Sequence, residues 1–154
     1  CSTVQVDFNL PERFDITYRT AENTSERPWM LHRALFGSIE RFLGFLIEHT
    51  SGNLPLWLAP TQAIVIPIAD RHAEMAQQVA DELRAHGGRI EVYDQNEPMR
   101  VKIAKAQGQR VPYMLVIGDK EVENGEVAVR ERHEGDLGSM KLEYFANIIE
   151  EAQV

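Results

Sequence analysis

Hydrophobic and polar residues alternate at the start of the chain, as they do in a half-buried strand. Residues 3–8 place Thr3 and Gln5 on the polar face and three apolar side chains on the other. The polar run 20–27 has no apolar periodicity, so it predicts a loop that joins two strands.

A longer apolar pattern at helical spacing follows. Residues 28–50 carry apolar side chains at steps of three and four, which predicts one amphipathic helix ending near Gly52. Gly37 and Ser38 lie inside this helix and weaken it, unless a backbone or a ligand comes close there. The proline-containing residues 52–60 then indicate a linker, and we expect two domains, 1–58 and 59–154.

Short apolar strands alternate with helical segments in the second domain. The expected strands are 63–68, 90–93, 113–117 and 127–132. The expected helices begin near Asp70, Glu97 and Ser139, where Asp70 and Ser139 act as N-caps. The first strand, helix and second strand form a βαβ unit with parallel strands. The sequence therefore predicts an α/β fold, with a mixed sheet of four or five strands and flanking helices.

Composition and charge narrow the class of protein. Hydrophobic residues at 44% and charged residues at 26% are typical of a soluble globular chain and exclude a mainly disordered or fibrous one. The single cysteine, Cys1, excludes an internal disulfide, as a reducing cytosol would require. A net charge of −8 means that any RNA contact must be local. We expect a cytoplasmic protein whose chain begins mid-protein, without a signal peptide or a membrane span.

Common catalytic and nucleotide-binding motifs are absent, which leaves individual residues to consider. A lone histidine in a helix, such as His32, is more often structural than a metal ligand. Arg33 and Glu40 are seven residues apart and would share a helical face. Arg41 beside them can either pair with an acid or hold a phosphate.

A local basic run stands out against the acidic background. No acid interrupts its four members, Arg100, Lys102, Lys105 and Arg110. This run predicts either an anion-binding patch, where Tyr113 offers a stacking face to an unpaired base, or a solvated helix face. Arg130 and Arg132 share one face of the strand 127–132 and would extend the patch.

Five segments resemble the threonyl-tRNA synthetase family of class II: CSTVQVDFNLPERF, PWMLHRALFGSIERFLGFLIEH, PLWLAPTQAIVIPI, VPYMLVIGDKEVENGEVAVR and GDLGSM. The resemblance covers essentially the whole chain. It implies that residues 1–58 end a class II antiparallel-sheet catalytic domain and that residues 59–154 form its anticodon-binding domain. The implied reaction activates L-threonine with ATP and Mg²⁺ and transfers it to tRNA(Thr).

The segment HRALFGSIERF is similar to motif 3 of this family. The resemblance implies that Arg41 is catalytic and contacts the ATP phosphates. It implies His32 as one of three ligands to a zinc ion that binds the amino and hydroxyl groups of threonine. The residues implied to line the ATP, adenylate and threonine pocket are Thr3, Gln5, Gly37, Ser38 and Arg41.

The resemblance also implies an anticodon site in the second domain, formed by Asn96, Lys102, Arg110, Glu121 and Arg130. Glu121 and Asn96 would bind base edges, whereas Arg110 and Arg130 would bind phosphates or bases. The chain departs from the family at Ala104, where an RNA-binding arginine is common, so Arg100 or Lys105 would take over part of this contact.

Motifs 1 and 2 and the other two zinc ligands are missing from the chain, so we expect it to be inactive by itself. The implied partners are tRNA(Thr), L-threonine, ATP and, in the full-length family, a second subunit of a homodimer. Neither a membrane nor DNA is expected as a partner. The alternative is a free-standing RNA-binding module that resembles the anticodon domain and lacks catalysis, which the combination of His32 and Arg41 disfavours.

Overall fold

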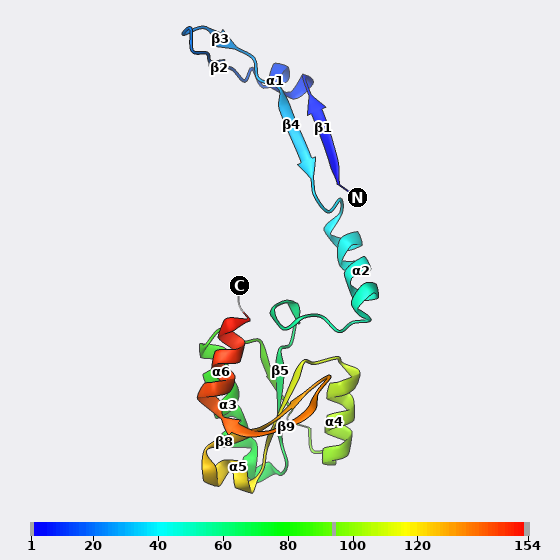
Figure 1. The fold of residues 1–154 in the computed structure, drawn as a ribbon, viewed down its shortest axis with the longest axis vertical. Coiled ribbons are helices and arrows are strands. Elements are labelled where there is room, and N and C mark those ends of the chain that lie inside the picture. Colours follow the sequence, from blue (N-terminus) through cyan, green and yellow to red (C-terminus); the bar gives the residue numbers. More distant parts are fainter. Residues whose placement is uncertain (1, 94, 153–154) are drawn as a thin grey trace. The chain divides into compact units, whose positions relative to one another are not determined.

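The computed structural model describes residues 2–93 and 95–152. The chain divides into two compact units, Cys1–His49 and Thr50–Val154 (Figure 1). In the described part, no helix is both long and apolar enough to cross a bilayer. The predicted domain boundary between residues 58 and 59 stays a prediction.

The first unit consists of two short antiparallel ribbons and two helices. Strand β1 (Thr3–Asp7) pairs with β4 (Met30–Ala34), and β2 (Tyr18–Arg19) pairs with β3 (Ser25–Glu26). Helix α1 (Asn9–Arg13) begins where the Asp7 carboxylate accepts hydrogen bonds from the Asn9 and Leu10 amides, at 2.8 and 3.0 Å. Among the described residues of this unit only Pro11 is buried, so these elements do not enclose a core of their own.

The prediction of one long helix over residues 28–50 is wrong. The first part of this range is strand β4, and helix α2 covers only Ile39–Thr50. Gly37 has a φ of 69°, a left-handed conformation that interrupts a helix, and the Ser38 hydroxyl then accepts a hydrogen bond from the Arg41 amide. Arg33 therefore lies in a strand and does not share a helical face with Glu40.

The second unit is built on a five-stranded mixed sheet, which confirms the predicted fold class. Its strands are β5 (Ala63–Pro67), β6 (Ile90–Val92), β7 (Tyr113–Ile117), β8 (Glu126–Glu131) and β9 (Gly135–Lys141). The order is β6-β5-β7-β8-β9; β5 is parallel to β6 and β7, whereas β8 is antiparallel to its two neighbours. The helices are η1 (Leu56–Leu58), η2 (Asp70–His72), α3 (Ala73–Ala85), α4 (Met99–Gly108), α5 (Asp119–Asn124) and α6 (Leu142–Glu151).

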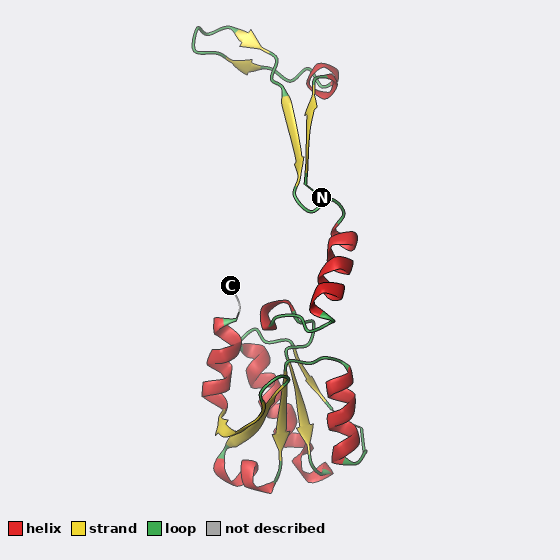
Figure 2. Ribbon diagram, turned by 45° about the vertical axis from the view of Figure 1, so that its right-hand side comes forward, coloured by secondary structure: helices red, strands yellow, loops and turns green. Residues whose placement is uncertain are grey.

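Helices cover the two faces of this sheet unequally (Figure 2). Helices α3 and α6 cover one face, where Leu83 and Phe145 pack with Val129 of β8. Helix α4 covers part of the other face through Ala106, which packs with Met114 of β7. Side chains alternate along a strand, so Ala128 and Arg130 point away from the α3 and α6 side. We call the β7–β9 part of this second face, centred on Ala128 and Arg130, the open sheet face.

The end of the chain differs from the prediction. Ser139 does not cap a helix but lies in β9, and α6 begins at Leu142. Strand β9 is polar and glycine-rich, so its sequence lacks the apolar alternation that marks a strand. Gly138 in this strand has a φ of 81° and lies beside a register shift between Val129 and Arg130 of β8. Helix α5 ends at Gly125, which takes a left-handed conformation.

Candidate functional site

The β1–β4 ribbon brings two of the predicted pocket residues, Thr3 and Gln5, onto one face with the predicted metal ligand His32. Gln5 and His32 are direct partners in the antiparallel register, and Thr3 pairs with Ala34 two positions along. Directly opposed residues in an antiparallel pair share a face, as do residues two apart in one strand. Thr3, Gln5 and His32 therefore form one polar row, and all three are exposed.

The other three predicted pocket residues lie together at the start of α2. Gly37, Ser38 and Arg41 line a cavity of 110 Å³ together with Phe36, Phe42 and Phe45. The Ser38 hydroxyl donates to the Glu40 carboxylate at 2.6 Å and thereby lowers the pKa of Glu40. No ion pair joins Arg41 to Glu40 in the described chain, so the structure does not show the paired alternative for Arg41. A guanidinium beside aromatic rings suits a ligand that has both a flat ring and phosphates.

The residues that the structure describes do not by themselves fit a zinc ion. A protein site for zinc takes three or four ligands. The described residues contain no group of three histidine, cysteine, aspartate or glutamate side chains placed to hold a metal. His32 faces Gln5, whose amide is not one of the usual zinc ligands.

On the open sheet face of the second unit, Arg130 has an unsatisfied donor. Its Nε atom is buried and has no hydrogen-bond partner. Arg130 pairs with Met114 in β7 and with Asp136 in β9, which places it between these two strands. Arg130 as a whole is half-buried, and a guanidinium at this position favours a ligand that supplies hydrogen-bond acceptors.

The predicted anticodon residues lie at two ends of the sheet. Arg110 directly precedes Val111 and β7, and Arg130 pairs near the amino-terminal end of β7, so these two lie toward one end. Asn96 follows β6 and Glu121 follows β7, so they lie toward the carboxyl ends of these strands. Glu121 accepts a hydrogen bond from the Gly118 amide at 3.0 Å, which fixes its side chain at the start of α5.

Lys102 is not available to RNA, which corrects its assignment to the anticodon site. It is 5% exposed, and its Nζ atom donates to the Pro67 carbonyl at 2.9 Å. Lys105 is also bound within the protein, because its Nζ atom donates to Glu97 at 2.7 Å. This bond raises the pKa of Lys105 and lowers that of Glu97. Of the basic run, Arg100 and Arg110 remain exposed without such a partner in the described structure.

Tyr113 is half-buried on the side of the sheet that α3 and α6 cover. Its ring meets the ring of Phe145 edge-on, with 5.2 Å between centroids, and it packs against the buried cluster beneath α3 and α6. Burial raises the pKa of Tyr113. Tyr113 thus lies on the face opposite to Arg130, and its role in base stacking stays a prediction.

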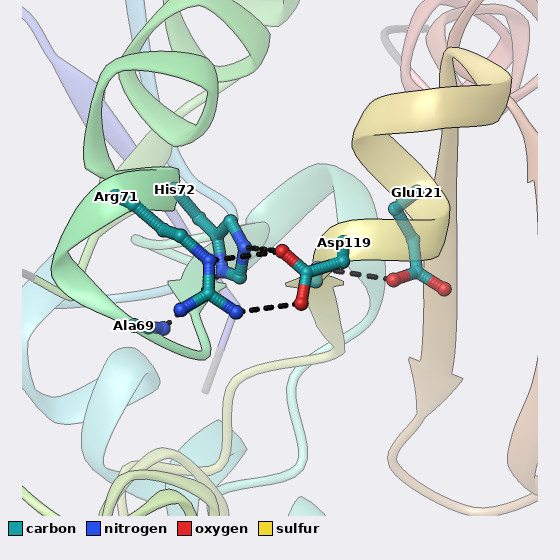
Figure 3. A network of polar contacts seen from close by, with 6 residues as sticks. Ala69, Arg71, His72, Asp119 and Glu121 are labelled. Atoms are coloured by element: carbon teal, nitrogen blue, oxygen red, sulfur yellow. Dashed lines mark hydrogen bonds and ion pairs between the residues drawn. The ribbon is translucent and has the colours of Figure 1, made fainter.

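A polar network that the sequence did not indicate holds the start of α5 (Figure 3). Arg71 donates to both carboxylate oxygens of Asp119, at 2.9 and 2.6 Å, and the His72 Nε2 atom lies 2.8 Å from Asp119 Oδ1. The Ala69 amide donates to His72 Nδ1 at 3.3 Å, which assigns the ring proton to Nε2. Arg71 and then His72 hold the pKa of the Asp119 carboxyl well below its usual range.

His72 itself is buried, with 2% of its surface exposed. No spacing in the sequence marks it, because its partner Asp119 is far away along the chain. The network ties the end of β5 to the end of β7, and so positions the first turn of α5, which carries Glu121.

Comparison with protein families agrees with this architecture. Residues 62–152 match the family described as the anticodon binding domain, and residues 1–50 match the tRNA synthetase class II core domain (G, H, P, S and T). The chain therefore belongs to the anticodon binding domain family of the class II synthetases and carries part of their catalytic core. The match over residues 1–50 favours a synthetase over the free-standing RNA-binding module.

The relatives that match nearly the whole chain are threonine–tRNA ligases. The enzyme of Aquifex aeolicus (strain VF5) is 53% identical over 150 residues, which cover 97% of this chain and 24% of the relative. That of Bacteroides thetaiotaomicron is 52% identical over 149 residues, covering 97% and 23%. The chain thus spans about a quarter of the length of the curated relatives it matches.

Solved structures show the same likeness. The RNA binding domain of threonyl-tRNA synthetase from Cryptosporidium parvum Iowa II has a TM-score of 0.85 and 35% identity, covering 99% of this chain and 38% of that chain. Prolyl-tRNA synthetase from Cryptosporidium parvum has a TM-score of 0.68 at 20% identity, which shows the shared fold alone. These findings confirm the resemblance to threonyl-tRNA synthetases.

Proposed function

We propose that this chain is part of a cytoplasmic threonine–tRNA ligase whose second unit binds the anticodon loop of tRNA(Thr). The observation that carries this proposal is the match of residues 62–152 to the anticodon binding domain family, together with the half-buried Arg130 on the open sheet face. An unpaired nucleotide in a splayed loop supplies acceptors on its phosphate and its base edges. The acidic chain is compatible with this binding, because the loop is held by a few local contacts.

Four side chains would contact the loop in this proposal: Asn96, Arg110, Glu121 and Arg130. Arg110 and Arg130 would hold phosphates or bases at one end of the sheet, and Asn96 and Glu121 would bind base edges at the other. Their placement at two ends suits a loop whose successive bases are spread out rather than stacked. Lys102 has no role in this contact because its ammonium is buried.

The first unit would complete the site for ATP and L-threonine in the whole enzyme, which acts as a homodimer. Arg41 would hold the phosphates of ATP, which carries Mg²⁺, and the rings of Phe36 and Phe42 would lie against the adenine. Thr3 and Gln5 would face the threonyl adenylate. The polar row that includes His32 would face the amino acid; His32 binds zinc there only if the other ligands come from outside this chain.

The test is binding of the chain to an anticodon stem-loop of tRNA(Thr) and to a loop with altered anticodon bases, at one stated salt concentration. We expect a preference for the cognate loop that falls about tenfold or more in Arg130→Ala. Arg13→Ala, which removes an exposed charge from α1 in the first unit, is the matched control and should change the affinity little. Equal binding to both loops would contradict the proposed function.

A further inference from the structure

Arg132 follows β8 and connects two segments that are far apart in the sequence. Its Nη1 atom donates to the Arg110 carbonyl at 2.7 Å, and its Nη2 atom donates to the Leu54 carbonyl at 3.1 Å. Its backbone amide donates to the Pro112 carbonyl at 2.9 Å, which fixes the start of the side chain. One guanidinium therefore joins the α4–β7 connection to the segment that precedes η1.

These contacts leave Arg132 little capacity to bind RNA, although it belongs to the predicted basic patch. Its third nitrogen, Nε, donates to His133 Nε2 at 3.2 Å, so all three guanidinium nitrogens donate to the protein. Arginine has five N–H donors in a fixed planar fork, and a bidentate phosphate contact needs two neighbouring ones. The contacts of Arg132 therefore favour a structural role over the predicted role of extending the RNA-binding patch of Arg130.

The carbonyl that Arg132 binds belongs to a residue in an unfavourable backbone conformation. Arg110 has a φ of 60°, in the left-handed region that residues with a Cβ rarely adopt. Such a conformation persists where the surroundings impose it, and it is often associated with function. The bonds on either side of Arg110 are its amide to the Gln107 carbonyl, at 3.0 Å, and its carbonyl to Arg132.

The segment at the other end of the bridge is itself held firmly. Arg89 donates to the Ala59 and Trp57 carbonyls at 2.9 and 2.8 Å, and buried Gln62 donates to the Leu56 carbonyl at 3.0 Å. The segment also lies against Arg110, because a Cβ added to Gly52 would be 3.6 Å from Arg110 Cγ. Arg132 therefore ties Arg110 to a fixed support rather than to a free loop.

We propose that Arg132 is a positioning residue for anticodon binding: it holds the left-handed backbone of Arg110 and so directs the Arg110 side chain toward the RNA. This inference rests on the proposed function of Arg110 as an RNA contact. Arg89 provides a matched comparison, because it donates to two carbonyls of the same segment but does not touch Arg110.

The test combines a double-mutant cycle with NMR on the whole chain. Arg132→Lys keeps the charge but cannot bridge both carbonyls, so we expect the affinity for the cognate stem-loop to fall by at least about fivefold. In the Arg110→Ala background the same change should have almost no further effect, because the residue it positions is gone. Arg89→Lys should leave the affinity within about twofold of the wild type. Arg132→Gln is the second variant if Arg132→Lys does not fold.

Two readouts separate this inference from the proposed function. Arg132→Lys should shift the backbone amide signals of Arg110 and Val111 without RNA, whereas Arg89→Lys should not. The positioning role would be overturned if Arg132→Lys lowered the affinity equally in the wild type and in the Arg110→Ala variant, or if it left the amide signals unshifted. In that case Arg110→Ala could still weaken binding, and the proposed function would stand. Failure of the wild type to prefer the cognate loop would instead contradict the proposed function, and with it the inference that Arg132 positions Arg110 for RNA binding.

Discussion

Gln5 and His32 lie directly opposite each other in the β1–β4 ribbon, although they are distant in the sequence. This pairing places the one proposed metal ligand of the chain against an amide rather than against a second ligand. Because the ribbon is exposed on both faces, its geometry depends on its backbone pairing and on little else in this chain.

The first prediction concerns zinc. We expect the chain to bind no stoichiometric zinc at neutral pH, because one imidazole is not enough for a stable site. His32→Asn should therefore leave both the metal content after dialysis and the thermal midpoint unchanged. One tightly held zinc ion per chain that is lost in His32→Asn would contradict this account.

The second prediction concerns pH and the Asp119 network. Arg71 and His72 lower the pKa of Asp119 in the folded state, so its carboxylate stabilises the fold above the pKa of the unfolded chain. This stabilisation is lost as the pH falls below about 4 toward the lowered pKa of the folded state. Asp119→Asn should be less stable than the wild type at pH 7, and the difference should narrow at pH 3. Urea unfolding at both pH values measures it, and an unchanged difference would contradict the role of the carboxylate.

The third prediction separates the buried lysine from the RNA contacts. Lys102→Met retains the apolar stem but leaves the Pro67 carbonyl without its donor, so we expect a loss of about 1–3 kcal/mol in unfolding free energy. The affinity for the anticodon stem-loop should stay within about twofold of the wild type, because the ammonium does not reach the surface. Arg110→Ala, tested beside it, should show the opposite pattern. A large loss of RNA affinity in Lys102→Met would return Lys102 to the binding site.

The fourth prediction concerns the segment before β5. We expect residues 59–154 to fold alone, since the cores beneath α3, α6 and α4 lie within them. Residues 50–154 should be more stable, by more than about 1.5 kcal/mol, because the longer segment supplies the Leu54, Leu56 and Trp57 carbonyls as acceptors. Urea midpoints of the two segments compare them. Equal stability would mean that these hydrogen bonds contribute nothing.

Sequence patterns predicted the second unit well because burial generates the patterns there. The apolar runs of β5 and β7 are enclosed on both faces, which produces the continuous apolar strands that were expected. Strand β9 escaped prediction because it is polar, glycine-rich and at the sheet edge.

The first unit and the polar contacts were harder to predict. In β4 the side chains are largely exposed, so nothing in the chain forces a period of two, and spacing alone suggested a helix. Predicted site residues such as Gly37 and Arg41 do share a cavity. The family resemblance, and not the spacing of residues, predicted that they belong together. The contacts of His72 with Asp119 and of Arg132 with Leu54 join distant parts of the chain, and no local pattern records them.

The most direct test of the central claim maps where the anticodon loop lies. Backbone amide signals of the chain would be followed by NMR while the stem-loop of tRNA(Thr) is added at fixed salt. We predict that the shifted signals cluster on the open sheet face around Arg130, with Arg110, Asn96 and the start of α5. Shifts confined to α3 and α6, on the opposite face of the sheet, would contradict it.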